Sequence, residues 1–365
     1  MKKRVIIFNP SLEGGGVEKN LYLISNYLKS NGISVEILTC NNNKSKKFKK
    51  GTKFIGTGSS FWQNKSRLVK YLICSLILFF NLLTKKNKPL VFSFQANIYA
   101  LVVAKILNTK IITRSNSAPV GWSRNVLKNT MYKFLINLSD DNIVNSLEFK
   151  KYFKKSFNVK STCIYNPFDK DFIRRNLKKK KKIEFFKKNF LNLICVGRLT
   201  DQKDHLTLLK SIKLLKSNFK IRLIILGKGK NKSLLENFIL KNKLQDRIKL
   251  LGYLNNPYHY INKSDIVILT STFEGLPNIL LEAQYLKKYI ISTNCLTGPS
   301  EILLKGKAGD LIKIGDHKKL SFLIKSYNNN KRVINKKIKE GAKRFDRFDY
   351  KLNCLKYLDL VNKNL

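Results

Sequence analysis

Two glutamates eight positions apart frame the segment of this sequence best suited to binding a ligand. Glu274 and Glu282 enclose residues 275–281, and this segment comes shortly after the strongly apolar stretch 266–269. The apolar stretch predicts a buried strand, and Pro277 suits the first position of a helix, where its missing N–H is not needed. The free N–H groups at such a helix start favour an anion, here between two carboxylates that can accept hydrogen bonds from hydroxyls. Hydroxyls on either side of phosphates are the layout of a sugar nucleotide.

Two cations are expected beside this segment. Arg198 and Lys203 follow another apolar run, 191–196, which also reads as a buried strand. Because the carboxyl ends of parallel strands meet at one sheet edge, both cations should lie near the proposed phosphate position. The guanidinium fork of Arg198 and the ammonium of Lys203 suit a diphosphate. Glycines mark the strand ends expected on the same edge, and they would let a ligand approach the backbone closely: Gly197, Gly227, Gly252 and Gly298.

Strand and helix signals alternate twice along the 365 residues. This alternation predicts an α/β fold with two parallel sheets that carry helices on both faces. We place the first Rossmann-like domain at 1–170 and the second at 191–346, with a basic linker at 171–190 that holds five consecutive lysines at 178–182. The amphipathic end, about 347–365, is expected to pack back on the first domain. Gly14, Gly15 and Gly16 follow the first predicted strand and fit either an anion-binding loop or a tight turn.

The net charge of +49 comes from 72 basic and 23 acidic residues. It indicates an anionic partner, either a nucleic acid or an acidic membrane, or else a general bias of composition toward lysine. The basic residues occur in both halves, which argues against a dedicated nucleic-acid module. The apolar stretch 71–83 is about 20 Å long as a helix, too short for a bilayer core of about 30 Å. It predicts either a core helix or an interfacial helix flanked by basic residues.

The cysteines and histidines give no sign of a metal site or a disulfide framework. The six cysteines are scattered without a Cys-x-x-Cys pair, and the three histidines are far apart. We interpret the cysteines as small buried hydrophobes in a reducing compartment. The apolar run 5–8 is too short for a signal peptide. These features predict a cytoplasmic protein.

Taken together, the motifs resemble the retaining glycosyltransferases of family 4. The resemblance rests on Gly15-Gly16-Val17-Glu18, Val196-Gly197-Arg198-Leu199 with Lys203, Leu226-Gly227-Lys228-Gly229, Leu251-Gly252-Tyr253, and the Glu274–Ala283 segment. The segment 297–303 is similar to the subgroup that builds bacterial surface polysaccharides. The resemblance implies a GT-B fold, in which two Rossmann-like domains face each other with the donor in the cleft between them.

The same resemblance implies a role for each site residue. Arg198 and Lys203 would hold the diphosphate and, with Glu274 at the sugar hydroxyls, form the catalytic set, while Glu282 would hold the ribose. The other donor-binding residues would be Gly15, Gly16, Gly197, Gly227, Gly252, Gly275, Leu276, Pro277 and Asn278. The resemblance also implies no metal ion or other cofactor, because in this family cations and helix dipoles typically stabilise the charge that develops on the diphosphate. Many members carry a histidine near Arg114, so acceptor-side roles for Arg114 and Asn116 are hypotheses, and Arg114 equally suits a structural ion pair.

We therefore predict a glycosyltransferase that moves a hexose or N-acetylhexosamine from a nucleotide sugar, UDP-linked, to a lipid-linked or saccharide acceptor. The enzyme would act in the synthesis of bacterial polysaccharide, lipopolysaccharide or capsule. It would be a cytoplasmic protein bound peripherally to the anionic inner face of the cytoplasmic membrane. The alternatives are a GT-B sugar-nucleotide epimerase and a basic nucleic-acid-binding protein. A retaining hydrolase would need carboxyl groups about 5 Å apart, and the placement of Glu274 on a loop and Glu282 inside a helix disfavours it.

Overall fold

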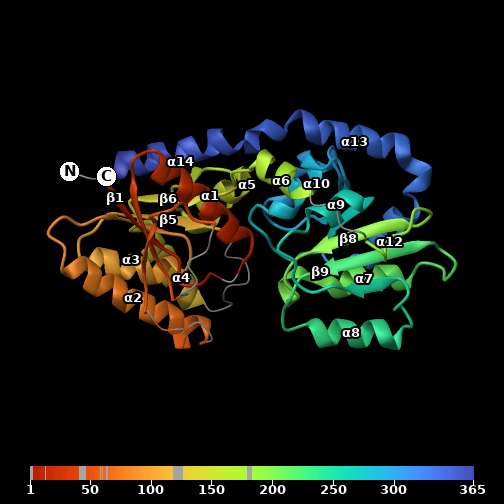
Figure 1. Ribbon diagram of the computed structural model, residues 1–365, viewed down its shortest axis with the longest axis horizontal. Helices are drawn as coiled ribbons and strands as arrows, with labels where there is room; N and C mark the ends of the chain where they lie inside the picture. The colour runs from red at the N-terminus through yellow and green to blue at the C-terminus, as the bar shows by residue number, and fades with distance from the viewer. Residues whose placement is uncertain are drawn as a thin grey trace. The chain divides into compact units, whose positions relative to one another are not determined.

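The chain folds into two compact α/β units (Figure 1). The computed structural model describes residues 3–12, 14–40, 47–57, 59, 61–62, 65–117, 126–178 and 183–365. The first unit comprises Met1–Pro167 and Phe348–Leu365, and the second comprises Phe168–Arg347. None of the described helices is long and apolar enough to cross a membrane.

The first unit is built on a parallel sheet with strand order β3-β2-β1-β4-β5-β6-β7. Its central strands are continuous apolar runs buried on both faces, as a parallel sheet covered by helices requires. The strands are β1 (Arg4–Phe8), β2 (Ser34–Leu38), β3 (Lys53–Ile55), β4 (Leu90–Ser93), β5 (Ile111–Ser115), β6 (Asp141–Val144) and β7 (Thr162–Cys163). The helices are α1 (Gly16–Ser30), α2 (Arg67–Leu83), α3 (Asn97–Ile106), α4 (Val126–Asn137), α5 (Leu147–Tyr152) with the π-helical turn η2 (Phe153–Phe157), and α14 (Tyr350–Asn364).

Helices cover both faces of this sheet. One core joins the sheet to α1 and α14, through residues such as Leu21, Leu28 and Tyr357. The other core lies under α2, α3, α4 and α5, and includes Leu78 and Phe149. The C-terminal helix α14 thus completes a unit whose other elements lie more than 180 residues earlier in the chain.

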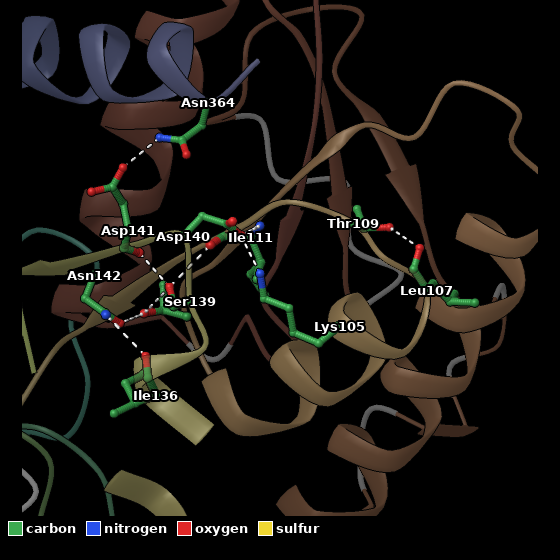
Figure 2. Close-up of polar contacts among 11 residues, drawn as sticks. Lys105, Leu107, Thr109, Ile111, Ile136, Ser139, Asp140, Asp141, Asn142 and Asn364 are labelled. Carbon is green, nitrogen blue, oxygen red and sulfur yellow. Dashed lines mark hydrogen bonds and ion pairs between the residues drawn. The ribbon is translucent and has the colours of Figure 1, made fainter. Parts of the chain in front are cut away.

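Two consecutive aspartates at the start of β6 connect the sheet to both helical layers (Figure 2). Asp140 accepts hydrogen bonds from Lys105 of α3 and from the backbone N–H of Ile111, each at 2.8 Å. Asp141 accepts one from the side-chain amide of Asn364 on α14, also at 2.8 Å. The carboxylate beside Lys105 has a lowered pKa because hydrogen bonds and the ammonium outweigh its burial. The adjacent carboxylates therefore hold helices on opposite faces of the sheet.

The second unit has a parallel sheet with strand order β10-β9-β8-β11-β12-β13. Its strands are β8 (Leu191–Val196), β9 (Ile221–Leu226), β10 (Ile248–Leu250), β11 (Ile266–Leu269), β12 (Tyr289–Thr293) and β13 (Asp310–Ile312). Its helices are α6 (Lys170–Leu177), α7 (His205–Lys213), α8 (Lys232–Lys241), α9 (Tyr258–Lys263), α10 (Asn278–Tyr285), α11 (Pro299–Ile302), α12 (His317–Lys325) and α13 (Lys331–Lys343). Short turns are η3 (Asp201–Lys203), η4 (Leu304–Gly306), η5 (Asn328–Asn330) and, at the boundary of the units, η6 (Phe345–Phe348).

The segment 171–190, predicted as a linker, differs from that prediction in its first part. Helix α6 (Lys170–Leu177) covers residues 171–177 of it and belongs to the second unit. Asp169 caps this helix by accepting a hydrogen bond from the N–H of Phe172 at 2.8 Å, and Ile173 is buried. Four of the five consecutive lysines, 179–182, lie outside the described residues. The basic composition led to the prediction of a linker, although this part of the segment forms a capped helix with one buried side chain.

Candidate functional site

Lys203 lies at the carboxyl edge of the second unit's sheet, in the turn that joins β8 to α7. Asp204 takes a left-handed conformation, φ 40°, and caps α7 by accepting hydrogen bonds from the N–H and the hydroxyl of Thr207 at 3.3 and 2.6 Å. This cap follows the short turn η3, whose last residue is Lys203, and it fixes the backbone position from which the Lys203 side chain extends. The position of the lysine thus depends on the capping residue that follows it.

Glu274 approaches Lys203 from the loop between β11 and α10. The ammonium Nζ of Lys203 lies 2.5 Å from Oε1 of Glu274, and the two side chains are only 14% and 9% exposed. An ion pair this strongly buried gains little net stability, because desolvation offsets much of the attraction. The sequence predicted both residues at one sheet edge but not this direct contact.

Backbone and side-chain hydrogen bonds connect the two loops along their length. The hydroxyl of Thr270 donates to the carbonyl of Lys203 at 3.0 Å, and the N–H of Thr272 donates to the carbonyl of Gln202 at 2.8 Å. In return, the amide of Gln202 donates to the carbonyl of Phe273 at 2.9 Å. The loops are therefore one rigid support for the Lys203–Glu274 pair.

A third loop, after β12, packs against the same support. The hydroxyl of Thr297 donates to the backbone carbonyl of Glu274 at 2.5 Å. Gly298 has φ +87°, and a Cβ there would lie 1.9 Å from the carbonyl oxygen of Gly275. Only glycine fits this close backbone crossing. The segment predicted as ligand-binding is thereby held from both sides.

The glycines after β8 and β9 make a second close crossing. Gly227 has φ +155°, and a Cβ there would lie 1.8 Å from the carbonyl oxygen of Gly197. The N–H of Leu199 donates to the carbonyl of Lys228 at 3.0 Å, and the N–H of Gly227 donates to the carbonyl of Gly252 at 2.8 Å. The predicted Gly197, Gly227 and Gly252 therefore adjoin one another at this edge, and backbone packing accounts for at least Gly227.

The remaining residues of the predicted donor set lie on or beside α10 and the β8 loop. Helix α10 begins at Asn278, with Pro277 just before it, one residue later than the sequence predicted. Glu282 lies in the second turn of that helix and is buried. Arg198 is exposed, and its guanidinium donates to the side-chain oxygen of Gln202 at 3.4 Å. A cation available to solvent thus lies next to the rigid loops.

Arg114 of the first unit is fully buried, and its guanidinium has protein partners on every nitrogen. Nε donates to the hydroxyl of Tyr357 at 2.8 Å, Nη2 donates to the side-chain oxygen of Asn166 at 2.7 Å, and Nη1 donates to that of Asn116. Asn116 in turn donates to the carbonyl of Phe94 at 2.6 Å. This geometry favours a structural role, with neutral partners in place of the ion pair we considered.

Two further glycines, Gly15 and Gly16, follow β1 in the first unit. Gly15 has an extended backbone, and α1 begins at Gly16. A Cβ at Gly15 would lie 3.1 Å from a carboxylate oxygen of Glu18. The tight approach shows why a small residue suits the turn, and the donor-capping role of both glycines stays a prediction.

His205, which the sequence analysis did not single out, follows the Lys203–Asp204 turn. It is buried, and within the described part of the chain neither ring nitrogen has a hydrogen-bond partner. Burial, and secondarily the charge of Lys203, lowers its pKa to about 4. The imidazole beneath the site is therefore neutral near pH 7. No group of three or more His, Cys, Asp or Glu side chains among the described residues could hold a metal ion.

Comparison with known sequences relates the second unit to one family. The family profile "Glycosyl transferases group 1" matches residues 176–345. The uncharacterized glycosyltransferase MJ1059 of Methanocaldococcus jannaschii is 34% identical over 54% of this chain, a match that spans about half (51%) of that relative. The N-acetylgalactosamine-N,N'-diacetylbacillosaminyl-diphospho-undecaprenol 4-alpha-N-acetylgalactosaminyltransferase of Campylobacter jejuni is 28% identical over 71% of this chain and 73% of its own. The capsular polysaccharide biosynthesis glycosyltransferase CapH of Staphylococcus aureus is 30% identical over 45% of this chain and 43% of its own.

Solved structures resemble the whole chain. A glycosyltransferase from Rickettsia africae matches with a TM-score of 0.78 at 18% identity, over 100% of this chain and 98% of that one. Anabaena Alr3699/HepE in complex with UDP-glucose matches with 0.78 at 16% identity, over 99% and 100%. Sucrose-phosphate synthase from Thermosynechococcus elongatus matches with 0.82 at 14% identity, over 99% and 98%. At these identities the likeness is one of fold, and it confirms the predicted GT-B class.

Proposed function

We propose a reaction for this chain, taking as the premise that it belongs to the glycosyl transferases group 1 family. It moves a hexose or N-acetylhexosamine from a UDP-linked donor to a lipid-linked or saccharide acceptor. That the protein is a glycosyltransferase follows from the family and the fold together. The observation that carries the proposed donor chemistry is the buried Lys203–Glu274 pair on its rigid loops.

The pair suits the two parts of a nucleotide sugar. A diphosphate needs cations when its bond to the sugar breaks, and Lys203 and Arg198 would supply them at one sheet edge. The carboxylate of Glu274 can accept hydrogen bonds from sugar hydroxyls while it holds the ammonium of Lys203. Glu282, in the second turn of α10, would hold the ribose. The donor would thus bind against the second unit without a metal ion.

Transfer would proceed with retention of the anomeric configuration. The bond between the anomeric carbon and the diphosphate oxygen breaks, and the bond from the acceptor oxygen forms on the same face of the sugar. On that face the acceptor hydroxyl lies beside the departing oxygen, so its proton passes to the leaving diphosphate. In this scheme the enzyme stabilises charge, and Lys203 and Arg198 make the main contribution.

The acceptor class is proposed from the relatives. The Campylobacter jejuni relative is named for transfer to a diphospho-undecaprenol-linked sugar, and others are named for amylovoran and capsular polysaccharide biosynthesis. A role in bacterial polysaccharide synthesis, including capsule or lipopolysaccharide, is consistent with these names. A lipid-linked acceptor would also place the enzyme at the inner, anionic membrane surface, where a net charge of +49 is favourable.

A thermal-shift screen of nucleotide sugars tests the donor proposal. A ligand at one hundred times its dissociation constant stabilises the native state by about 2.7 kcal/mol. We expect UDP-sugars to raise the melting temperature of the wild-type protein more than sugars of other nucleotides do. The shift should shrink in Lys203→Met and stay in Lys343→Met, an exposed lysine of the same unit. Equal shifts in both variants would remove Lys203 from the donor site.

A further inference from the structure

Helix α2 carries apolar side chains on two opposite sides. Its inner side packs into the core through Cys74, Leu78 and Leu82. Its outer side exposes another stripe at three- and four-residue spacing: Leu68, Leu72, Leu76, Phe80 and Leu83. A helix at the surface of a soluble protein normally presents polar residues on its outer side. The exposed stripe of α2 therefore has no explanation in the packing of this unit.

The two neighbouring helices continue this apolar surface. Helix α2 packs on α3, and α3 packs on α4. Figure 1 shows all three on one side of the first unit's sheet, opposite α1 and α14. Val102 and Ile106 of α3 are exposed, as are Leu127, Met131 and Phe134 of α4. We call these side chains and the α2 stripe the outer face.

A hollow enlarges the apolar area on the α2 side. It has a volume of about 600 Å³ and is lined by Trp62, Ile73, Leu76, Ile77 and Phe80, together with three small or polar residues. Leu76 and Phe80 belong both to the hollow and to the exposed stripe. The outer face thus gathers exposed apolar side chains from three neighbouring helices beside a recess, as surfaces that bind a partner do.

The charge of the chain segment that bears this face favours an anionic partner. Residues 37–139 include 18 lysines and arginines and no aspartate or glutamate. Even spacing of the chain's 23 acidic residues would place about six in a segment of this length. A lysine-rich composition alone does not remove carboxylates from more than a quarter of the chain. Arg67, Lys86, Lys110 and Lys133 are exposed on or beside the three helices.

We propose that the outer face docks on an anionic lipid bilayer. Leucine, isoleucine and phenylalanine side chains enter the boundary between headgroups and acyl chains, while the lysines and arginines meet the anionic phosphates. A nucleic acid would use the cations but gain nothing from exposed aliphatic side chains. A protein partner would favour a surface poor in lysine. The inference deepens the proposed function, on which it rests for a lipid-linked acceptor, by naming the surface that reaches the membrane.

Vesicle flotation of the full-length chain tests the proposal. The probe is a phosphatidylcholine vesicle, with or without phosphatidylglycerol. The test variant replaces three outer-face residues that are 50–61% exposed, Leu72→Ser/Leu76→Ser/Phe80→Ser. The matched control replaces three residues of the second unit that are 50–58% exposed, Leu234→Ser/Leu240→Ser/Phe322→Ser. All six side chains are mostly outside the core, so both variants should fold.

We expect wild type and control to bind vesicles with phosphatidylglycerol much more than vesicles without it. The outer-face variant should bind these vesicles at least about tenfold more weakly, since each apolar side chain that enters the bilayer contributes to the partitioning of the protein onto it. Equal binding by the two variants, or no binding by wild type at low salt, would overturn the proposal. Glu274→Gln should bind vesicles like wild type while losing transfer. A failure of the donor chemistry would therefore leave the flotation result intact, and the two proposals fail separately.

Discussion

The ammonium of Lys203 and the carboxylate of Glu274 form a buried ion pair, with Nζ and Oε1 2.5 Å apart. The two residues are 71 positions apart and come from different loops at one edge of the second unit's sheet. Hydrogen bonds to backbone carbonyls, donated by Gln202, Thr270 and Thr272, hold the loops together around the pair. The pair, next to the exposed Arg198, therefore has the fixed geometry that the proposed donor binding requires.

Breaking this pair from one side should be more damaging than removing it. Lys203→Met leaves the Glu274 carboxylate buried without its cation, and we expect a loss of about 3 kcal/mol in the free energy of unfolding. The double variant Lys203→Met/Glu274→Gln should recover part of that loss, because no uncompensated charge remains. Urea unfolding measures both values. Additive losses in the double variant would show that the two side chains do not interact as the structure indicates.

Gly298→Ala should disrupt the site, because the new Cβ would collide with the carbonyl oxygen of Gly275 and φ is +87°. We expect a loss of stability above 2 kcal/mol or a comparable loss of donor affinity. The control is Gly315→Ala, where φ is +79° but no atom lies within 4 Å of the added Cβ. It should cost about 1 kcal/mol, the conformational penalty alone. Similar effects of both substitutions would argue against a tight crossing at Gly298.

The buried His205 should make the protein less stable in mild acid. Burial lowers its pKa to about 4 from an unfolded value of about 6.5, so between these values the unfolded chain binds more protons than the native one. The resulting loss is fully absent above pH 7 and grows as the pH falls to 4, where it is on the order of 3 kcal/mol.

Unfolding curves measured across this range for wild type and His205→Leu isolate that contribution. The stability of wild type relative to His205→Leu should fall as the pH falls, because only the histidine binds a proton on unfolding and leucine does not titrate. His317→Gln, at a partly exposed histidine of the same unit, is the control for replacing a histidine elsewhere. A constant offset between wild type and His205→Leu would show that His205 does not titrate as its burial predicts.

Tyr357→Phe should weaken the first unit by removing the hydroxyl that accepts from Nε of Arg114. A buried donor left without a partner costs about 1–3 kcal/mol, more when it is charged. The tyrosine lies on α14, so the change should also loosen the C-terminal helix, which hydrogen exchange can detect. Tyr253→Phe, at an exposed tyrosine, should change stability by less than about 0.5 kcal/mol. A neutral Tyr357→Phe would mean that another group satisfies the guanidinium.

Much of the fold could be predicted because its central strands are continuous apolar runs. Segments such as 191–196 and 266–269 are buried on both faces, and glycines or polar residues end them clearly. The edge strand β3 was missed because Lys53–Ile55 is short and half exposed, without an apolar run. Helix α6 was missed because half of its residues are charged and Ile173 alone is buried, so it has no apolar periodicity.

The site could be predicted only as far as strand ends and residue types allow. The rule that parallel strands end at one edge brought Arg198, Lys203 and Glu274 together. It could not show that Lys203 pairs directly with Glu274, since side-chain contacts depend on the course of two loops. Nor could it show that Arg114 is buried. The polar partners of its guanidinium are Asn116, Asn166 and Tyr357, and the last two are far from Arg114 in the sequence. Long-range partners of this kind leave no local signal.

The most direct test of the central claim is release of UDP from a UDP-sugar by the purified enzyme, alone and with a lipid-linked acceptor. Wild type should release UDP and form a glycoside, whereas Glu274→Gln should lose at least about a hundredfold of that rate, or ~2.7 kcal/mol of transition-state stabilisation. Glu340→Gln, which removes a partly exposed carboxylate paired with Lys343, is the control and should keep the wild-type rate. Release of UDP by Glu274→Gln at the wild-type rate, or epimerised donor in place of a glycoside, would contradict the account.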